Sequence, residues 1–336
     1  MYEAFYGFTQ KPFELNPDPA FHYMSSGHRE AFLHLKYAIL ENKGFVVVTG
    51  EIGSGKTTLI NVLLGKVGAV LTVGLINHTM VAPAEFLSMT CREFNLNVNG
   101  GGISESLELL HKYLLNQRIA GKRVTLIIDE AQNLSVETLE EVRMISNLET
   151  KKHRLIQIIL VGQPELKNKL KNKGLIQLTQ RVAVFYHLGA LGKDEVNTYI
   201  HWRLKACGGR GISLFDPEAV EAIGRYSKGI PRVINILCDN ALLVGFSDRA
   251  KTIDKKIVED VIRVRESGEF FFSDSPASAP SPVRQHSQSA DLSYTARTLG
   301  NRMQLMTGEM HGIKTALEKI EQHLCRIAEG GSHHIK

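Results

Sequence analysis

The residues that decide the fold run from 45 to 57 and read Phe45-Val-Val-Val-Thr-Gly-Glu-Ile-Gly-Ser-Gly-Lys-Thr57. The apolar, β-branched start of this stretch predicts a strand that is buried on both faces, as in a parallel sheet. The glycines that follow let backbone N–H groups turn inward around phosphate oxygens, and a helix predicted to begin near Lys56 adds the partial positive charge of its amino end. The stretch therefore predicts a phosphate-binding loop between a strand and a helix.

The loop matches the pattern GxxxxGK[ST], in which each residue type has a chemical reason. Lys56 can reach the β- and γ-phosphates of a nucleotide, and the hydroxyl of Thr57 can ligate Mg²⁺. From average composition, the fixed positions should occur by chance in roughly one of a hundred unrelated chains of this length. The sequence thus predicts a nucleotide site made by Gly50, Glu51, Ile52, Gly53, Ser54, Gly55, Lys56, Thr57 and Thr58.

A second polar element, Asp129-Glu130, directly follows the apolar run 124–128. A carboxylate at the carboxyl end of a buried parallel strand lies beside the phosphate loop, so Asp129 is expected to hold Mg²⁺ together with Thr57. Glu130 is then placed to polarise the attacking water. The alternative is that the acidic pair only caps a following helix. No guanine-reading Asn/Thr-Lys-x-Asp pattern follows a predicted strand, which favours ATP over GTP.

The rest of the chain alternates between strand and helix patterns up to Leu191 and is helical beyond it. Apolar runs at 70–76 and 155–161 indicate two further strands, and helical patterns cover 56–64, 83–94, 104–119 and 136–149. This alternation predicts an α/β fold with a parallel sheet. Helical patterns at 194–206, 216–226, 231–246 and 254–265 predict an all-helical lid. We expect a nucleotide-binding domain over residues 1–190 and the lid over residues 191–272.

Composition narrows the class of protein. The 336 residues carry a formal net charge of +5, with 43% hydrophobic and 22% charged residues, which are ordinary values for a globular chain. No window approaches the ~18 consecutive apolar residues of a membrane span, and the first ten residues do not resemble a secretory signal. The four cysteines lie far apart without a CxxC pair, which favours reduced thiols and a cytoplasmic location.

The C-terminal part of the sequence has a different character. Residues 273–296 are rich in Ser, Pro and Ala, and such a segment is predicted to be a disordered linker. Between Leu299 and Ile327, Leu, Met and Ile recur at alternating spacings of four and three, which predicts a coiled-coil helix over 297–329. This helix would serve self-association or partner capture; the alternative is an amphipathic helix that docks back on the rest of the chain.

Taken together, these patterns resemble the AAA+ ATPases and, more narrowly, the general secretion pathway protein A (ExeA-like) type. The resemblance covers about residues 1–270 and is carried by the stretches 5–19, 50–57, Asp129-Glu-Ala-Gln132, Leu160-Val-Gly-Gln-Pro-Glu-Leu166 and Gly229-Ile-Pro-Arg-Val-Ile-Asn235. It implies an AAA+ P-loop NTPase that binds ATP and Mg²⁺ and hydrolyses ATP in a homo-oligomer. Full-length relatives continue into a membrane span and a peptidoglycan-binding domain, neither of which this sequence contains.

The resemblance also implies roles for three residues outside the loop. Gln163 matches the sensor-1 position, Arg232 the sensor-2 arginine and Arg181 the arginine finger supplied by a neighbouring subunit. A guanidinium offers planar donors to the charged oxygens of a transition state, and a finger in trans can be worth ~10³–10⁵ in rate. The alternative for each arginine is a surface side chain that solvates a helix. His28 and Arg29 would lie near the nucleotide base or serve packing.

Two functions follow from the resemblance. The first is an ATPase that drives a step in secretion or in cell-envelope or polysaccharide assembly, recruited to a membrane-embedded partner at the inner membrane through the C-terminal helix. The alternative is a DNA-associated ATPase of the transposition or helicase-loader type, with Lys167, Lys169, Lys171 and Lys173 as its candidate track. A lysine run is more often a solvated helix face, so DNA is the less favoured partner. An intact Lys56, Asp129 and Glu130 argue against a scaffold that binds nucleotide without hydrolysing it.

Overall fold

The computed structural model describes residues 1–15, 21, 23–67, 71–98, 102–150, 153–209 and 214–267. The chain divides into two compact units, Met1–Ile262 and Arg263–Lys336, and the site and all but the last few residues of the fold described below belong to the first. The predicted linker (273–296) and coiled-coil helix (297–329) lie outside the described residues. Among the residues that the structure describes, no helix is both long enough and apolar enough to cross a bilayer.

A five-stranded parallel sheet forms the centre of the α/β layer. Its strand order is β2-β3-β4-β1-β5, with bounds β1 Phe45–Gly50, β2 Leu71–Ile76, β3 Arg123–Ile128, β4 Ile156–Gly162 and β5 Val182–Leu188. The predicted parallel α/β class is confirmed. No strand was predicted over β5, although β5 begins with the apolar run Val182-Ala-Val-Phe-Tyr186; in the structure the exposure of its side chains alternates along the strand.

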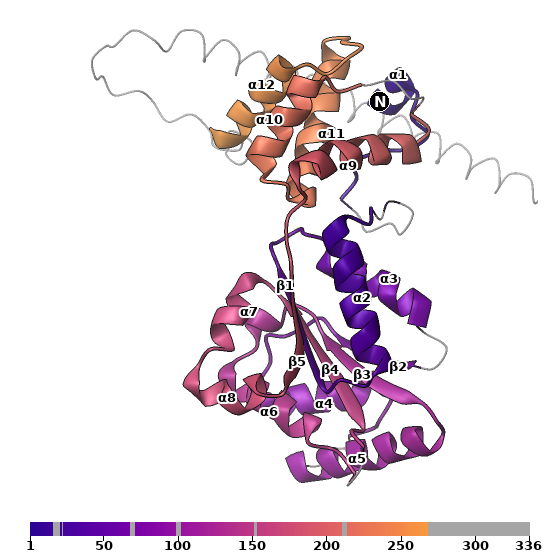
Figure 1. Ribbon diagram of the computed structural model, residues 1–336, viewed down its shortest axis with the longest axis vertical. Helices are drawn as coiled ribbons and strands as arrows, with labels where there is room; N and C mark the ends of the chain where they lie inside the picture. The colour runs from indigo at the N-terminus through magenta and orange to yellow at the C-terminus, as the bar shows by residue number, and fades with distance from the viewer. Residues whose placement is uncertain are drawn as a thin grey trace, which may run out of the picture. The chain divides into compact units, whose positions relative to one another are not determined.

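Helices cover both faces of the sheet (Figure 1). Successive side chains of a strand point to opposite faces, so Val46 and Val48 pack toward one side and Phe45 and Val47 toward the other. The first side is covered by α2 Ser26–Leu40 and α3 Lys56–Val67. The second is covered by α4 Pro83–Glu93, α5 Ile103–Ile119, α6 Val136–Ser146, α7 Pro164–Lys169 and α8 Ile176–Thr179.

The remaining helices share a separate core, which we call the helical cluster. It comprises α1 Tyr2–Tyr6, α9 Lys193–Ala206, α10 Pro217–Ser227, α11 Pro231–Ser247 and α12 Lys255–Glu266. The chain's first residues contribute Tyr2, Phe8, Phe13 and Phe21 to this core. The N-terminal segment therefore packs with helices that follow it by almost two hundred residues, a pairing that no local pattern indicates.

A buried arginine on α9 holds the N-terminal segment in place. Arg203 is 6% exposed, and its guanidinium donates to the backbone oxygens of Pro12 at 2.6 Å and Glu14 at 2.9 Å. It also lies over the ring of Phe21, 4.7 Å from the centroid. A buried charge is tolerated when its donors are satisfied. Because the N-terminal segment supplies the acceptors for Arg203, this side chain ties the segment to α9. The chain consequently passes between the helical cluster and the α/β layer twice, at residues 23–26 and 188–193.

Candidate phosphate and nucleotide site

The predicted phosphate loop joins β1 to α3 and is shaped by two glycines with left-handed backbone conformations. Gly53 has φ 77° and Gly55 has φ 94°, values that side chains rarely allow. A Cβ built on Gly53 would lie 2.3 Å from Cβ of Arg232, and one built on Gly55 would lie 2.7 Å from Nε2 of His28. The loop thus needs glycine both for its conformation and for the close approach of its neighbours.

Lys56 begins α3 and is buried within the loop. Its Nζ donates to the backbone oxygens of Gly50 at 2.8 Å and Glu51 at 3.0 Å, and the residue is only 6% exposed. Burial lowers the pKa of Lys56, while the carboxylates of Glu130 and Asp129 act in the opposite direction. A bound polyphosphate would offset the cost of burying this cation.

The two residues predicted to hold Mg²⁺ lie side by side. The hydroxyl of Thr57 donates to Oδ2 of Asp129 at 2.7 Å, although the two are 72 positions apart in sequence. Their oxygens are the ligand type that Mg²⁺ prefers. No group of three or more His, Cys, Asp or Glu in the part of the chain that the structure describes could hold a metal ion. The pair therefore fits a metal that takes its other ligands from phosphate and water.

Glu130 follows β3 with φ 51° and is fixed by two glutamines. Its Oε2 accepts from Nε2 of Gln163 at 3.1 Å and from Nε2 of Gln132. Gln132 also accepts, through Oε1, from the backbone N of Gln163 at 3.0 Å. Gln132 thus links the carboxylate after β3 to the end of β4. Gln132 had no predicted role, and its only signal in the sequence was its position within Asp129-Glu-Ala-Gln132.

Arg232 lies at the start of α11, beside the phosphate loop. Its backbone N donates to the backbone O of Gly53 at 3.3 Å, and its side chain lines the same cavity as Lys56. The turn before α11 packs closely on the segment that connects β5 to α9. A Cβ on Gly229, where φ is 75°, would lie 2.2 Å from the backbone O of Leu191 in that segment. The structure therefore brings Arg232 to the site predicted for it.

Arg181, in contrast, lies away from this site. It directly precedes β5, and its Nη1 donates to Oγ of Ser146 at 3.1 Å. In the parallel register Val182 pairs with Phe45, whereas Leu188 pairs with Gly50 at the phosphate loop. At ~3.3 Å per residue, these two ends of the strand are about 20 Å apart. Arg181 is thus at the opposite end of the sheet from the phosphate loop of its own chain.

A cavity of about 530 Å³ collects the residues of the site. Besides Lys56, Thr57, Glu130, Gln163 and Arg232, it is lined by His28, Tyr23, Tyr199 and Asn235. His28 is 4% exposed, and its Nδ1 lies 2.6 Å from Oγ of Ser25. Ser54 Oγ is buried and has no hydrogen-bond partner among the described residues, which leaves a polar atom in the loop unsatisfied. His28 is thus placed at the cavity wall, where the sequence left its role open.

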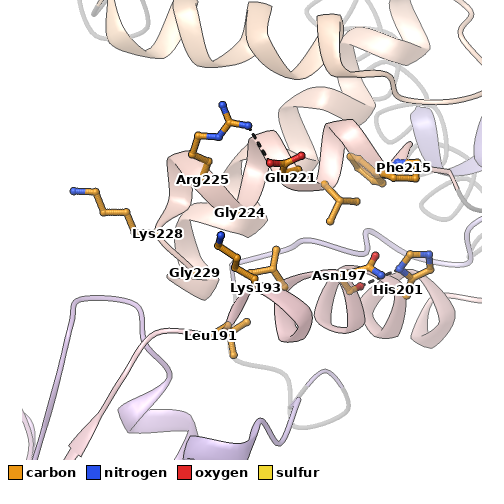
Figure 2. A pocket seen from close by; sticks show the side chains of 14 residues that line it. Leu191, Lys193, Asn197, His201, Phe215, Glu221, Gly224, Arg225, Lys228 and Gly229 are labelled. Atoms are coloured by element: carbon orange, nitrogen blue, oxygen red, sulfur yellow. Dashed lines mark hydrogen bonds and ion pairs between the residues drawn. The ribbon is translucent and has the colours of Figure 1, made fainter.

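A second cavity, of about 920 Å³, lies between α9 and α10 (Figure 2). Lys193, Arg225 and Lys228 line it, and Arg225 is paired with Glu221 at 3.3 Å. Apolar residues, among them Leu191, Val196 and Val220, contribute more of its lining than polar groups do. The cavity is therefore a largely apolar groove within the helical cluster, with charged side chains beside it.

Two lysines of the run after Gln163 make contacts with other parts of the fold. Lys169 Nζ donates to the backbone oxygens of Gln132 and Leu134, at 2.5 and 2.6 Å. Lys167 Nζ lies over the ring of Phe185, 5.6 Å from its centroid. Lys169 thus stabilises the short helix η2 (Ala131–Asn133) that follows Glu130.

Comparisons with known proteins agree with this geometry. Residues 39–170 match the family model described as an AAA domain. The chain is 38% identical over 248 residues to general secretion pathway protein A of Aeromonas hydrophila, which covers 74% of this chain and 45% of that protein. Among solved structures, the Aeropyrum pernix ORC2 protein superposes with a TM-score of 0.56 at 19% identity, covering 76% of this chain and 71% of that one.

The fold and the matched domain define an AAA+ P-loop ATPase. Within that class, the chain belongs to the general secretion pathway protein A type. It spans about half the length of the curated relatives it matches, at 45% and 59% of their lengths.

Proposed function

We propose that this chain binds ATP with Mg²⁺ in the 530 Å³ cavity and hydrolyses it. The observation that carries the proposal is that Lys56, the Thr57–Asp129 pair and Glu130 meet at the carboxyl ends of β1 and β3. The volume lies within the ~300–1,000 Å³ typical of small-molecule sites. Lys56 is buried without a salt bridge among the described residues, a placement that suits an anionic ligand.

In binding, the phosphate loop presents its backbone N–H groups and the amino end of α3 to the phosphates. Lys56 is positioned for the β- and γ-phosphates, and Thr57 and Asp129 for the metal. When bound, Mg²⁺ would neutralise charge on the phosphate oxygens and polarise them. The unsatisfied hydroxyl of Ser54 is a further donor available inside the loop.

In hydrolysis, Glu130 accepts a hydrogen bond from the attacking water and orients it toward the γ-phosphorus. The bond from that phosphorus to the bridging oxygen breaks, and ADP and phosphate leave. Gln163 and Gln132 hold the Glu130 carboxylate during this step. Arg232 supplies positive charge from the helical cluster.

The helical part, predicted over residues 191–272, would act as a lid on the nucleotide domain predicted over residues 1–190, although the N-terminal segment of that range packs in the core of the helical cluster. The proposal rests on Arg232, which belongs to α11 and contacts the phosphate loop through Gly53. Closure of such a lid excludes water and completes the set of catalytic groups. Residues 273–296 and 297–329 would then link this ATPase to a self-associating or partner-binding coiled coil.

The active form would be a homo-oligomer in which Arg181 serves the site of a neighbouring subunit. Its placement at the far end of β5 excludes direct contact with the nucleotide of its own chain. A guanidinium delivered across a subunit interface would make hydrolysis depend on assembly.

The step that the ATPase drives would lie in secretion or cell-envelope assembly, through a membrane-embedded partner. This rests on the 38% identity to a protein named for the general secretion pathway. In the lysine run that the DNA-associated alternative would use, Lys169 is engaged with backbone oxygens, whereas Lys167, Lys171 and Lys173 are exposed.

The test is steady-state ATP hydrolysis by the full chain against protein concentration, with and without duplex DNA. We expect Mg²⁺-dependent turnover that rises per subunit with assembly and ignores DNA. Glu130→Gln should retain ATP and lose turnover, whereas Lys56→Ala should lose binding. Normal turnover by Glu130→Gln would contradict the assignment, and stimulation by DNA would favour the alternative.

A further inference from the structure

One carboxylate contacts both segments that connect the helical cluster to the α/β layer. Glu195 lies in the first turn of α9. Its Oε1 accepts from the backbone N of Ser26 at 2.7 Å, and its Oε2 accepts from the backbone N of Gly192 at 3.1 Å. Ser26 is the first residue of α2, and Gly192 directly precedes α9. The side chain therefore joins the amino ends of two helices that belong to different cores.

The charge of Glu195 suits this position. Burial alone would raise its pKa, but hydrogen bonds from the backbone of Ser26 and Gly192, together with nearby Arg29, outweigh this effect and lower the pKa. The amino ends of α2 and α9 also carry partial positive charge that favours a carboxylate. Glu195 is therefore ionised at neutral pH and accepts from both segments at once.

From Gly192 the contacts continue to Arg232. The backbone N of Leu191 donates to the backbone O of Gly229 at 2.9 Å. Figure 2 shows Leu191 and Gly229 at the same end of the groove between α9 and α10. Three residues beyond Gly229, the backbone N of Arg232 reaches Gly53 in the phosphate loop. A continuous series of short contacts thus connects Ser26 with the phosphate loop.

We propose that Glu195 is a positioning residue for ATP hydrolysis. By tying Ser26 to Gly192, it fixes the turn at Leu191 and Gly229 and thereby the placement of Arg232 at the nucleotide. The inference rests on the proposed function, because it needs Arg232 to contact the nucleotide. Its bond to Gly192 is the ordinary capping of a helix. The bond to Ser26 crosses to another element and adds nothing to α9 itself.

The first test compares Glu195→Ala and Glu195→Gln with the control Asp194→Ala, which removes the same charge from the same helical turn. The backbone amides of Ser26 and Gly192 that donate to Glu195 are solvent-accessible, so water can replace the carboxylate. The thermal midpoints of both Glu195 variants should therefore match that of Asp194→Ala. We expect Glu195→Ala to slow single-turnover hydrolysis roughly tenfold, short of the ~10²-fold that a 1 Å misplacement can cost. Glu195→Gln keeps one acceptor oxygen, so its single-turnover rate should fall between that of the parent chain and that of Glu195→Ala.

The second test is a double-mutant cycle with Arg232→Ala. If Glu195 acts by placing Arg232, then Glu195→Ala should cause no further loss of single-turnover rate in the Arg232→Ala background. Losses that multiply would show that Glu195 acts by another route and would overturn the inference.

A third readout separates this inference from the proposed function. We expect hydrogen exchange in residues 226–236 to slow when a fluorescent ADP analogue binds, in the parent chain and in Asp194→Ala but not in Glu195→Ala. This measurement needs binding and no hydrolysis. A parent chain that binds and turns over nucleotide, with Glu195→Ala equal to Asp194→Ala throughout, would overturn the inference alone. A parent chain that binds no nucleotide would overturn both.

Discussion

Gln163 donates from its side-chain Nε2 to Oε2 of Glu130 at 3.1 Å, and the backbone N of the same glutamine donates to Gln132. The residue after β4 therefore fixes the carboxylate that follows β3, across the two neighbouring strands. This arrangement leaves Glu130 with little freedom to turn away from the cavity, since Gln132 binds the same carboxylate oxygen.

Removing either glutamine should loosen this carboxylate without emptying the nucleotide site. We expect Gln132→Ala and Gln163→Ala each to lower the hydrolysis rate about tenfold or more, within the ~10²–10⁴-fold that a general base contributes. ATP affinity, measured with a catalytically slow fluorescent analogue, should stay within about threefold of the parent. Because both act on Glu130, the double variant should lose less than the product of the single losses. Weakened binding with an unchanged rate would contradict this role.

Arg181 should act only across a subunit interface. Arg181→Ala is expected to lower turnover strongly while leaving ATP binding intact, since the residue is remote from its own phosphate loop. Mixing it with Lys56→Ala should restore part of the activity, because a subunit with an intact site can then receive an intact arginine. Rates of mixed and separate samples at equal total concentration provide the measurement. An absence of recovery on mixing would place the arginine outside the neighbouring site.

Gly229 lies in the turn before Arg232, and Gly224, inside the neighbouring helix α10, provides a control for it. A Cβ on Gly229 would lie 2.2 Å from the backbone O of Leu191 at φ 75°, whereas one on Gly224 would meet Val196 at an ordinary 3.6 Å. Gly229→Ala should lower the free energy of unfolding by about 2–3 kcal/mol. Gly224→Ala, inside helix α10, should raise it by about 0.5–1 kcal/mol. Urea unfolding of both variants tests the pair, and a tolerated Gly229→Ala would refute the close approach.

Cys207 should make the fold sensitive to alkaline pH. Burial raises the pKa of its thiol to about 11, although nearby Arg203 acts to lower it. An unfolded thiol ionises near ~8.5, so between that pH and the folded pKa only the unfolded state releases the proton. The contribution of the Cys207 thiol to the free energy of unfolding is therefore complete below about pH 8.5 and declines as the pH rises toward the folded pKa. Urea unfolding at about pH 8 and about pH 10 should show a smaller decline for Cys207→Ala than for the parent chain; an equal decline would contradict the prediction.

Local patterns were sufficient for the parts of the fold that consist of buried strands and the loop between them. The runs at 45–49 and 124–128 are apolar on both faces, so they predicted β1 and β3 and the neighbourhood of Lys56, Thr57 and Asp129. β5 was not predicted although residues 182–186 are all apolar, and its place at the edge of the sheet follows only from its pairing with β1. The resemblance to AAA+ proteins supplied Gln163 and Arg232, which no local chemistry around them indicates.

The amino-acid sequence by itself determined the phosphate loop, its strand and helix and the α/β class, because these depend on residues adjacent in the chain. Only the tertiary structure decided that Phe13 and Phe21 pack with α9, that Gln132 binds Glu130, and that Glu195 joins Ser26 to Gly192. Long-range contacts such as that between Glu195 and Ser26 join residues 169 positions apart. Such contacts depend on how separately formed elements pack, and a single hydrogen bond between them leaves no periodic signal in the chain.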